Sequence, residues 1–348
     1  VNMLSRLCVF TMVTFYSLFY FTISSISLIE AQQISWDMGQ PMPTNRTEIV
    51  SEKIGDKIYV LGGADYLKDG IMNVIEIYDP NKDTWTQSTP LPISIDHTAA
   101  VSYEGKLFLV GGFLEDKNPT DKLWIYDSTS NTWTEGAPLS APRGALAAEV
   151  INGTIYAIGG VNSTHHPVTT NEAYNIENNS WSFREPLSKP KHHVASAVIG
   201  DSMYVLGGRL LGNGEPSEIN EALTNMDDNS RYDPDNDEWV ELEPMQIRRS
   251  GFSASEMNDQ IYVFGGHIPA GATTKVERYD PIANNWTSLS DMKYERSGAT
   301  SIDYGNKIYV FGGQHEGLHA LNVNEILSIE SNITASMQSS AIGDPNNE

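Results

Sequence analysis

The sequence lacks the residues on which several classes of protein depend. It has one cysteine, Cys8, which excludes an intrachain disulfide and a cysteine-based zinc site. It also has 22 Lys and Arg against 45 Asp and Glu, which gives a formal net charge of −23. Nucleic acids and anionic lipid surfaces recruit basic proteins, so this balance speaks against both as partners.

The residues that are present indicate a folded, β-rich chain. Hydrophobic residues make up 40% of the sequence, which is enough for a globular core. The 28 glycines, 16 tyrosines and 7 tryptophans suit many short strands joined by tight turns. Composition therefore bounds the class of fold without naming a ligand.

An apolar segment lies near the N-terminus. Residues 7–29 carry no charge and follow Arg6. The segment is long enough to span a bilayer. It also fits a secretory signal with Ile29 and Ala31 at the −3 and −1 positions before cleavage. We assign residues 1–31 to a signal peptide, which we favour, or to an N-terminal membrane anchor. Either predicts an extracytoplasmic protein that contacts a membrane only through this segment, if it is uncleaved.

Sequons of the form N-x-[ST] agree with export. Their asparagines are candidates for glycosylation, with unmodified turn residues as the alternative at each position. They are Asn45, Asn152, Asn162, Asn178, Asn285 and Asn332.

One repeat fills the rest of the chain. Each copy ends a strand-like run such as IYVL with a glycine doublet, and a tryptophan lies 26 residues before each doublet. The doublets are Gly62-Gly63, Gly111-Gly112, Gly159-Gly160, Gly207-Gly208, Gly265-Gly266 and Gly312-Gly313. The tryptophans are Trp36, Trp85, Trp133, Trp181, Trp239 and Trp286, and tyrosines at 78, 126, 174, 232 and 279 each precede the next tryptophan by seven residues.

This pattern resembles the kelch repeat, in which each copy forms a four-stranded blade of a β-propeller. The resemblance covers about residues 33–331 and implies an all-β, six-bladed propeller. The strand bearing Trp36 has no repeat before it, and the last repeat has no tryptophan after it. We therefore expect the Trp36 strand to close the sixth blade beside residues 325–331. The predicted domains are the propeller at 32–331 and a polar, disordered tail at 332–348.

Cationic residues recur ten positions after the tryptophans, where we expect the first strand of each blade to start. Five of the six are basic: Arg46, Arg143, Lys191, Arg249 and Arg296, with Ile95 at the remaining position. An anion-binding ring is one interpretation. The favoured one is structural, with each side chain bonded to carbonyls or carboxylates of a neighbouring blade.

The candidate ligand-binding residues follow these basic positions and the glycine doublets. In kelch proteins both places face the mouth of the central channel, so the resemblance implies the same here. The predicted set is Glu48, Asp96, His97, Phe113, His192, His193, Arg209, Ser250, His267, Ser297 and Gln314. A polar pocket for a peptide or glycan is the favoured interpretation. A His/carboxylate metal site is a second, if blade-to-blade distances are short enough for one ion. Plain solvated channel lining is the third.

Two further features sit in loops. The fourth repeat carries an insertion at about 209–229, which is either a recognition loop or a neutral lengthening. His165 and His166 are expected to be exposed, and His315 and His319 to lie at the pocket rim. Neither pair has flanking carboxylates that would specify a metal motif, so we assign no metal ligand and no cofactor.

The sequence favours a binding module over an enzyme. Kelch oxidases related to galactose oxidase need a Tyr–Cys crosslink, and the predicted mature chain has no cysteine. A periplasmic kelch family that epimerises sialic acid needs an acid/base pair and an arginine, which Glu48 or a histidine with Arg209 would supply. We predict an extracytoplasmic, monomeric module that binds a protein or glycan at the channel mouth. A sugar mutarotase is the alternative, and no catalytic residue is assigned.

Overall fold

The structure, a computed structural model, describes residues 31–210 and 224–332. These residues hold six four-stranded sheets and no helix, so the described part of the chain has no helical segment that could cross a bilayer. Residues 1–30, 333–348 and 211–223 lie outside the described residues, and with them most of the predicted signal or anchor segment, the tail and most of the insertion. Gln33–Glu330 form one compact unit.

Each sheet is one blade, numbered in chain order. Blade 1 is β2 (Val50–Ile54), β3 (Lys57–Leu61), β6 (Ile75–Asp79) and β7 (Thr84–Gln87); blade 2 is β8 (Ala99–Tyr103), β9 (Lys106–Val110), β10 (Leu123–Asp127) and β11 (Thr132–Glu135); blade 3 is β13 (Ala147–Ile151), β14 (Thr154–Ile158), β16 (Asn171–Asn175) and β17 (Ser180–Arg184). Blade 4 is β18 (Ala195–Ile199), β19 (Ser202–Leu206), β20 (Asn229–Asp233) and β21 (Glu238–Leu242); blade 5 is β22 (Ser253–Met257), β23 (Gln260–Phe264), β26 (Val276–Asp280) and β27 (Asn285–Ser288); blade 6 is β28 (Thr300–Tyr304), β29 (Lys307–Phe311), β32 (Asn324–Asn332) and β1 (Ala31–Met38).

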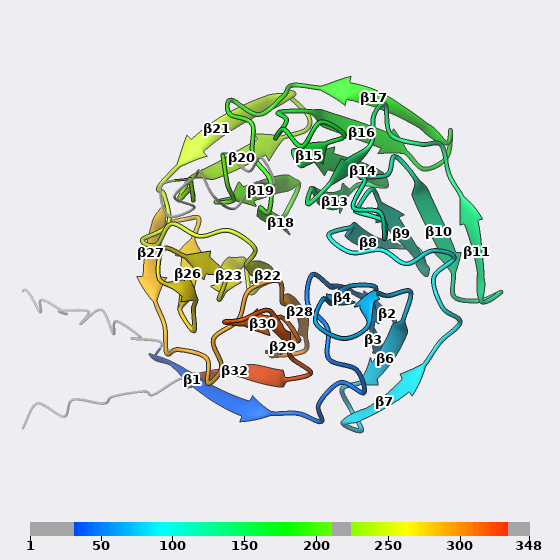
Figure 1. Cartoon of the computed structure of the whole chain (residues 1–348). Helices are drawn as coiled ribbons and strands as arrows, with labels where there is room; N and C mark the ends of the chain where they lie inside the picture. Colours follow the sequence, from blue (N-terminus) through cyan, green and yellow to red (C-terminus); the bar gives the residue numbers. More distant parts are fainter. Residues whose placement is uncertain (1–30, 211–223, 333–348) are drawn as a thin grey trace, which may run out of the picture. The chain divides into compact units, whose positions relative to one another are not determined.

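The blades stand in a ring with their first strands nearest the axis (Figure 1). Blade 6 has the strand order β1-β32-β29-β28, so the N-terminal strand bearing Trp36 is its outermost strand. This confirms the predicted closure. Four two-stranded sheets on one side of the ring complete the set. Three are hairpins: β4 (Ala64–Asp65) with β5 (Gly70–Ile71), β24 (His267–Ile268) with β25 (Gly271–Ala272), and β30 (Gln314–His315) with β31 (His319–Ala320). The fourth pairs β12 (Arg143–Gly144) with β15 (Val161–Asn162), on either side of β13 and β14 in the chain.

The glycine doublets join each blade to the next. Gly62 and Gly63 have φ of 60° and 88°, a region that L-residues seldom adopt. A Cβ on Gly62 would lie 2.5 Å from the carbonyl oxygen of Ile95 in the approach to blade 2. The Gly63 amide donates a hydrogen bond of 2.9 Å to that same oxygen. Only glycine fits this approach, and the same contact recurs around the whole ring.

The tyrosines and tryptophans are cross-strand partners that pack between sheets. Tyr78 on β6 faces Trp85 on β7, with ring centroids 4.9 Å apart, and Tyr78 is also in contact with Phe311 of blade 6. The Trp85 indole donates to the carbonyl of Gln40, which follows the outer strand of blade 6. Each pair therefore fills space between blades and ties neighbouring blades together.

The recurring basic residues are structural. The Arg46 guanidinium is fully buried, donates to the Gly62 carbonyl at 2.7 Å and pairs with the Glu76 carboxylate at 2.7 Å. Arg143–Glu172, Arg249–Glu277 and Arg296–Glu325 repeat this pair. The prediction of a structural role holds, but two details were wrong. The carboxylate belongs to the arginine's own blade, and the first strand starts four residues later, because a residue at positive φ intervenes.

Blade 2 replaces the buried ion pair with apolar side chains. Ile95 stands at the arginine position, and Trp124, opposite Leu109, stands where Glu76 stands opposite Val60. Both members have changed together, so neither a buried charge nor an unpaired carboxylate is left behind. The same two positions of the repeat therefore accept either a buried salt bridge or a pair of apolar side chains.

Candidate functional site

A closed ring of backbone hydrogen bonds surrounds the channel mouth. One residue per blade contributes, and each amide donates to the carbonyl of the ring residue in the preceding blade, at 2.7–3.3 Å. We call these the ring residues: Glu48, His97, Ala145, His193, Gly251 and Gly298. The ring fixes where their side chains begin.

All six ring residues have positive φ, between 47° and 64°. This suits Gly251 and Gly298, whereas a side chain in this region costs about 1 kcal/mol. Glutamate and histidine nevertheless occupy three of the ring positions. Strain at an L-residue is a reason to look for function there.

A network of acidic groups surrounds His97. Its Nδ1 lies 3.0 Å from the Asp96 carboxylate and its Nε2 lies 3.3 Å from the Glu48 carboxylate. The Tyr66 hydroxyl donates to the other oxygen of Asp96 at 2.5 Å. Burial acts to lower the pKa of His97, but Glu48 and Asp96 together outweigh it and raise the pKa to about 9. His97 is therefore an imidazolium at neutral pH.

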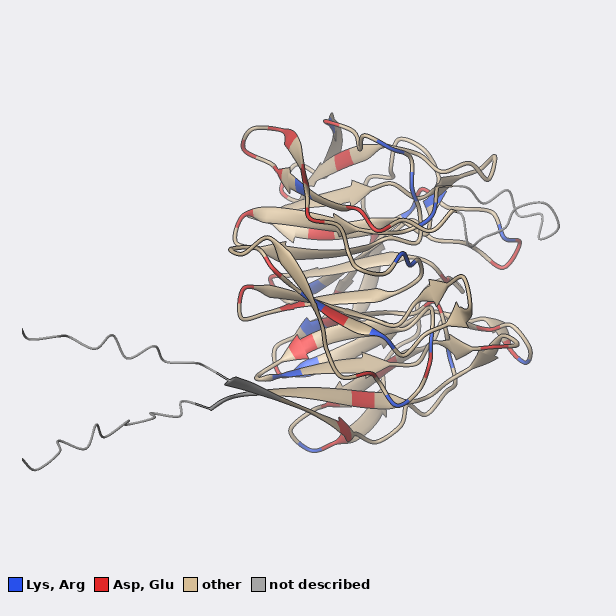
Figure 2. Ribbon diagram, turned by 90° about the vertical axis from the view of Figure 1, so that its left-hand side faces the viewer, with Lys and Arg blue, Asp and Glu red and all other residues tan. Residues whose placement is uncertain are grey.

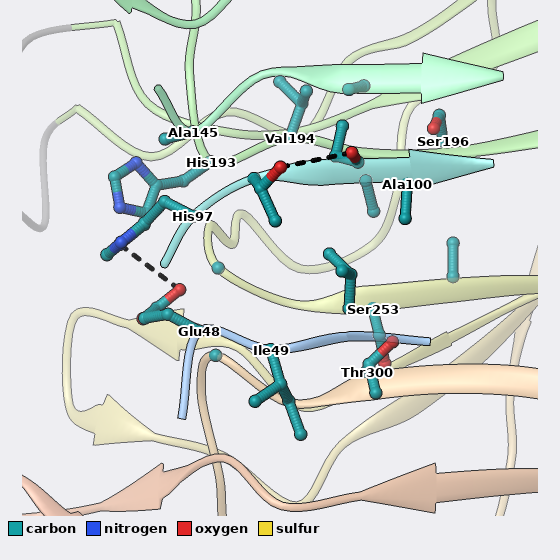
Figure 3. A pocket seen from close by; sticks show the side chains of 18 of the residues that line it. Glu48, Ile49, His97, Ala100, Ala145, His193, Val194, Ser196, Ser253 and Thr300 are labelled. Atoms are coloured by element: carbon teal, nitrogen blue, oxygen red, sulfur yellow. Dashed lines mark hydrogen bonds and ion pairs between the residues drawn. The ribbon is translucent and has the colours of Figure 1, made fainter. Parts of the chain in front are cut away.

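His193 lies beside His97 with the opposite charge state. The two rings meet edge to face with centroids 4.8 Å apart, as the labelled side chains in Figure 3 show. Its Nδ1 lies 2.5 Å from the Nδ1 of His192. Burial lowers the pKa of His193 well below its usual value, and the positive charge of Arg209 lowers it further. His193 is therefore neutral at pH 7.

Four of the predicted contact residues are buried. Asp96, His192, Ser250 and Ser297 have exposed fractions of 2%, 3%, 1% and 7%. Each of the four directly precedes a ring residue in the chain. The ring residue lines the channel, whereas the residue before it forms a β-bridge with the loop after the glycine doublet. Asp96 and His192 contact the side chains of His97 and His193, while the other two lie behind the lining.

The second predicted set lies where expected, opposite the first. Phe113, Arg209, His267 and Gln314 are half-buried and pair with Asp96, His192, Ser250 and Ser297 respectively. The structure thus brings both sets to one end of the channel. A role in binding for these residues remains a prediction.

Two carboxylates deeper in the channel escaped the sequence analysis. Glu52 on β2 and Glu149 on β13 line the channel cavity of about 190 Å³ together with the ring residues. Burial raises the pKa of Glu52 to about 8, assisted by the charge of Glu149, and burial raises the pKa of Glu149 to about 7. Each lies four residues beyond a ring residue, a position whose side chain does not line the cavity in the other four blades.

A wide funnel lies above one side of the mouth. Its volume is about 990 Å³, and hairpin and loop residues of blades 1, 2, 3 and 6 line it. Apolar residues at its wall are Tyr66, Ile71, Phe113 and Leu318, and charged residues are Asp69, Asp96, Glu115 and Lys117. Figure 2 shows that Asp and Glu also lie on loops at both edges of the propeller. The funnel therefore combines an apolar wall with three carboxylates, Lys117 and the His97 imidazolium.

The remaining histidines lie in the connections outside the four-stranded blades. His165 and His166 are exposed, as predicted, and His165 also reaches the funnel. His315 and His319 stack on each other with centroids 5.2 Å apart in the hairpin of β30 and β31. Among the sequons, the asparagines at 45, 152, 178 and 285 are exposed, whereas the Asn162 side chain accepts hydrogen bonds from its own turn.

Known proteins match this chain in both sequence and fold. A family model described as the Attractin/LZTR1 beta-propeller matches residues 58–318. Kelch-like protein 41 of Homo sapiens is 29% identical over 83 residues, which are 24% of this chain and 14% of that protein. Kelch-like protein 6 of Homo sapiens is 39% identical over 59 residues, which are 17% of this chain and 9% of that protein. This chain therefore spans only a small part of either relative.

A solved structure shares the whole architecture. The structure titled "Structure of YjhT" superposes with a TM-score of 0.71 and covers 85% of this chain and 100% of that chain, at 15% identity. Such a likeness shows the fold alone. The doublets, blades and closure define the class: this is a six-bladed kelch-type β-propeller. Within that class the chain belongs to the Attractin/LZTR1 beta-propeller family, whose model matches most of it. Kelch propellers are commonly protein-interaction modules. Membership of this class is consistent with a protein partner.

Proposed function

We propose that the chain is an extracytoplasmic binding module that recognises a protein or carbohydrate at the channel mouth. The funnel of about 990 Å³ carries this proposal, because it is large enough for several side chains of a partner. The apolar segment at 7–29 and the exposed sequon asparagines support the extracytoplasmic location.

The lining of the funnel favours a protein segment over a sugar. Tyr66 and Leu318 are 40% and 49% exposed at its wall. Exposed apolar residues rimmed by polar groups are typical of protein interaction sites. Asp69 and Glu115 add negative charge beside them. We therefore expect a segment that presents a lysine or arginine next to an aliphatic or aromatic residue.

Selection from a random peptide library against the full chain tests this function. We expect enrichment of peptides with that pairing, and loss of their binding in Phe113→Ala. Phe183→Ala is the matched control, because Phe183 is 69% exposed on the outer strand β17, outside the funnel lining. Enriched peptides that bind Phe113→Ala as well as the wild type would refute the funnel as the site. A glycan array run in parallel would detect the carbohydrate form of the proposal.

A sugar mutarotase is the second candidate, and the pairing of His97 with His193 favours it. A protonated and a neutral imidazole in edge-to-face contact supply the acid and the base that opening and closing of a sugar ring require. Arg209 acts electrostatically on both rings. Proton NMR of anomeric exchange in sialic acid tests this activity, with loss expected in His193→Gln. Exchange no faster than in buffer would remove the enzyme from consideration.

A further inference from the structure

Three side chains with metal-ligating atoms converge on the ring. Glu48, His97 and His193 each offer one ligand atom, and these atoms lie within 4.8 Å of one another. The distance between blades, which decides whether one ion can be shared, is therefore short here. We propose that Glu48, His97 and His193 bind a divalent transition metal ion, with Zn²⁺ the best match to two imidazoles and a carboxylate.

The separations fit a tetrahedral ion. Ligand atoms at about 2.1 Å from Zn²⁺ in a tetrahedron lie about 3.4 Å from each other. The 3.3 Å between His97 Nε2 and the Glu48 carboxylate already has this value. The ligand atom of His193 lies within 4.8 Å of the other two, so it needs to approach them by at most about 1.4 Å. Figure 3 shows the three side chains gathered at one end of the channel.

A second layer of residues orients both imidazoles. Asp96 engages Nδ1 of His97, which leaves Nε2 directed at Glu48. The Nδ1 of His192 lies 2.5 Å from Nδ1 of His193, so a neighbouring imidazole contacts this ring through one nitrogen. A histidine that ligates a metal is almost always held through its other ring nitrogen in this way. These contacts are independent of the distances among the three ligands.

The backbone prepares the site in advance. The three ligands start from the hydrogen-bonded ring and share its positive φ, so their Cβ atoms are fixed before any ion binds. Gly251 and Gly298 show that the ring forms with glycine at this position. The fold itself therefore does not require glutamate or histidine there.

The local charges permit a dication. Arg209 lies near His193 and opposes a positive ion, whereas the carboxylates of Glu48 and Asp96 favour one. With three protein ligands, a fourth position remains for water or a partner's side chain.

Titration of the metal-free full chain tests the site. After dialysis against a chelator, Zn²⁺ is followed by calorimetry, and Co²⁺ is added separately as a spectroscopic probe of tetrahedral geometry. We expect one saturable site per chain with tetrahedral Co²⁺ bands. Glu48→Gln and His193→Gly should each weaken Zn²⁺ binding about 100-fold, and Asp96→Asn about 10-fold through its effect on His97.

The variants separate loss of a ligand from loss of the fold. His193→Gly places at the ring the residue that two other blades already carry, and thermal unfolding checks that it folds. If it fails to fold, Glu48→Gln decides the question. His319→Ala removes a histidine of the stacked pair in blade 6 and should leave Zn²⁺ affinity unchanged. Wild-type affinity in Glu48→Gln, loss of binding in His319→Ala, or absence of saturable binding would each overturn the proposal.

Discussion

His97 and His193 occupy the same ring position two blades apart and have opposite charge states. Their φ values are 47° and 52°, and their rings are in contact. Yet the pKa of His97 rises to about 9, whereas that of His193 falls well below its usual value. Backbone and burial are alike at the two positions, so the difference lies in the neighbouring side chains.

The two halves of the mouth differ in their charged groups. Glu48 and Asp96 flank His97 from blades 1 and 2. Arg209, His192 and His267 surround His193 from blades 4 and 5. The repeat therefore supplies a common frame, and the residues next to each ring position set the chemistry. An asymmetric mouth in a nearly symmetric ring is suited to a ligand that has one orientation.

Removing the carboxylate of Asp96 should produce the largest change. Asp96 is 2% exposed, so Asp96→Asn leaves a buried imidazolium with one partner fewer. We expect a loss of about 3–5 kcal/mol in the free energy of unfolding at pH 7, and a lower pKa of His97 by NMR titration. Denaturant unfolding of the metal-free protein measures the first quantity. Asp69→Asn, at an exposed carboxylate of the funnel, is the control and should be neutral. An unchanged pKa would mean that Glu48 alone sets the charge of His97.

The pH dependence of two matched variants should run in opposite directions. A raised folded pKa gives stability that is complete below the unfolded pKa of about 6.5 and is lost as pH rises through about 9. Between pH 6.5 and about 9, the free energy of unfolding of the wild type should therefore fall relative to that of His97→Gln. The expected fall is ~3 kcal/mol, at about 1.4 kcal/mol per pKa unit. A lowered folded pKa acts below pH 6.5, where the wild type should lose stability relative to His193→Gln. If stability relative to the wild type changed with pH in the same direction in both variants, the two histidines would not differ in charge state.

Strain at the ring should give the smallest change. Ala145 shares the positive φ of both histidines and has no ionisable group. Ala145→Gly should therefore raise the free energy of unfolding by up to about 1 kcal/mol, because glycine relieves the strain. Ala147→Gly, in the strand β13, is the control and should lower it by about 0.5–1 kcal/mol. Equal losses in both variants would show that the ring position is unstrained.

Periodic features of the sequence were sufficient to predict the propeller. The doublets such as Gly62-Gly63 report a backbone conformation and a close approach that other residues cannot meet. The Tyr78–Trp85 spacing reports a cross-strand pair. The doublets and the Tyr–Trp spacing reflect contacts that recur from blade to blade. A single sequence therefore shows each pattern several times. The unmatched Trp36 then indicated how the ring closes.

The site was predicted only in part. Glu48, His97 and His193 were assigned to the mouth and lie there. Asp96, His192, Ser250 and Ser297 were also expected to touch a ligand; they are buried, Asp96 still lines the funnel, and their role in binding stays a prediction. Spacing places a residue in a repeat; it does not say which of two adjacent side chains faces the axis. Glu52 and Glu149 were missed because they stand at a repeat position that is uncharged in the other four blades.

The sequence by itself determined the number of blades, the strand that closes the ring and the residues that gather at one end of the channel. These follow from contacts between a few positions at constant separations. Only the tertiary structure decided that His97 is charged, that His193 is neutral and that both lie beside Glu48. Those outcomes depend on residues from four blades brought within a few ångströms of one another, where burial and charge compete at distances that spacing along the chain does not encode.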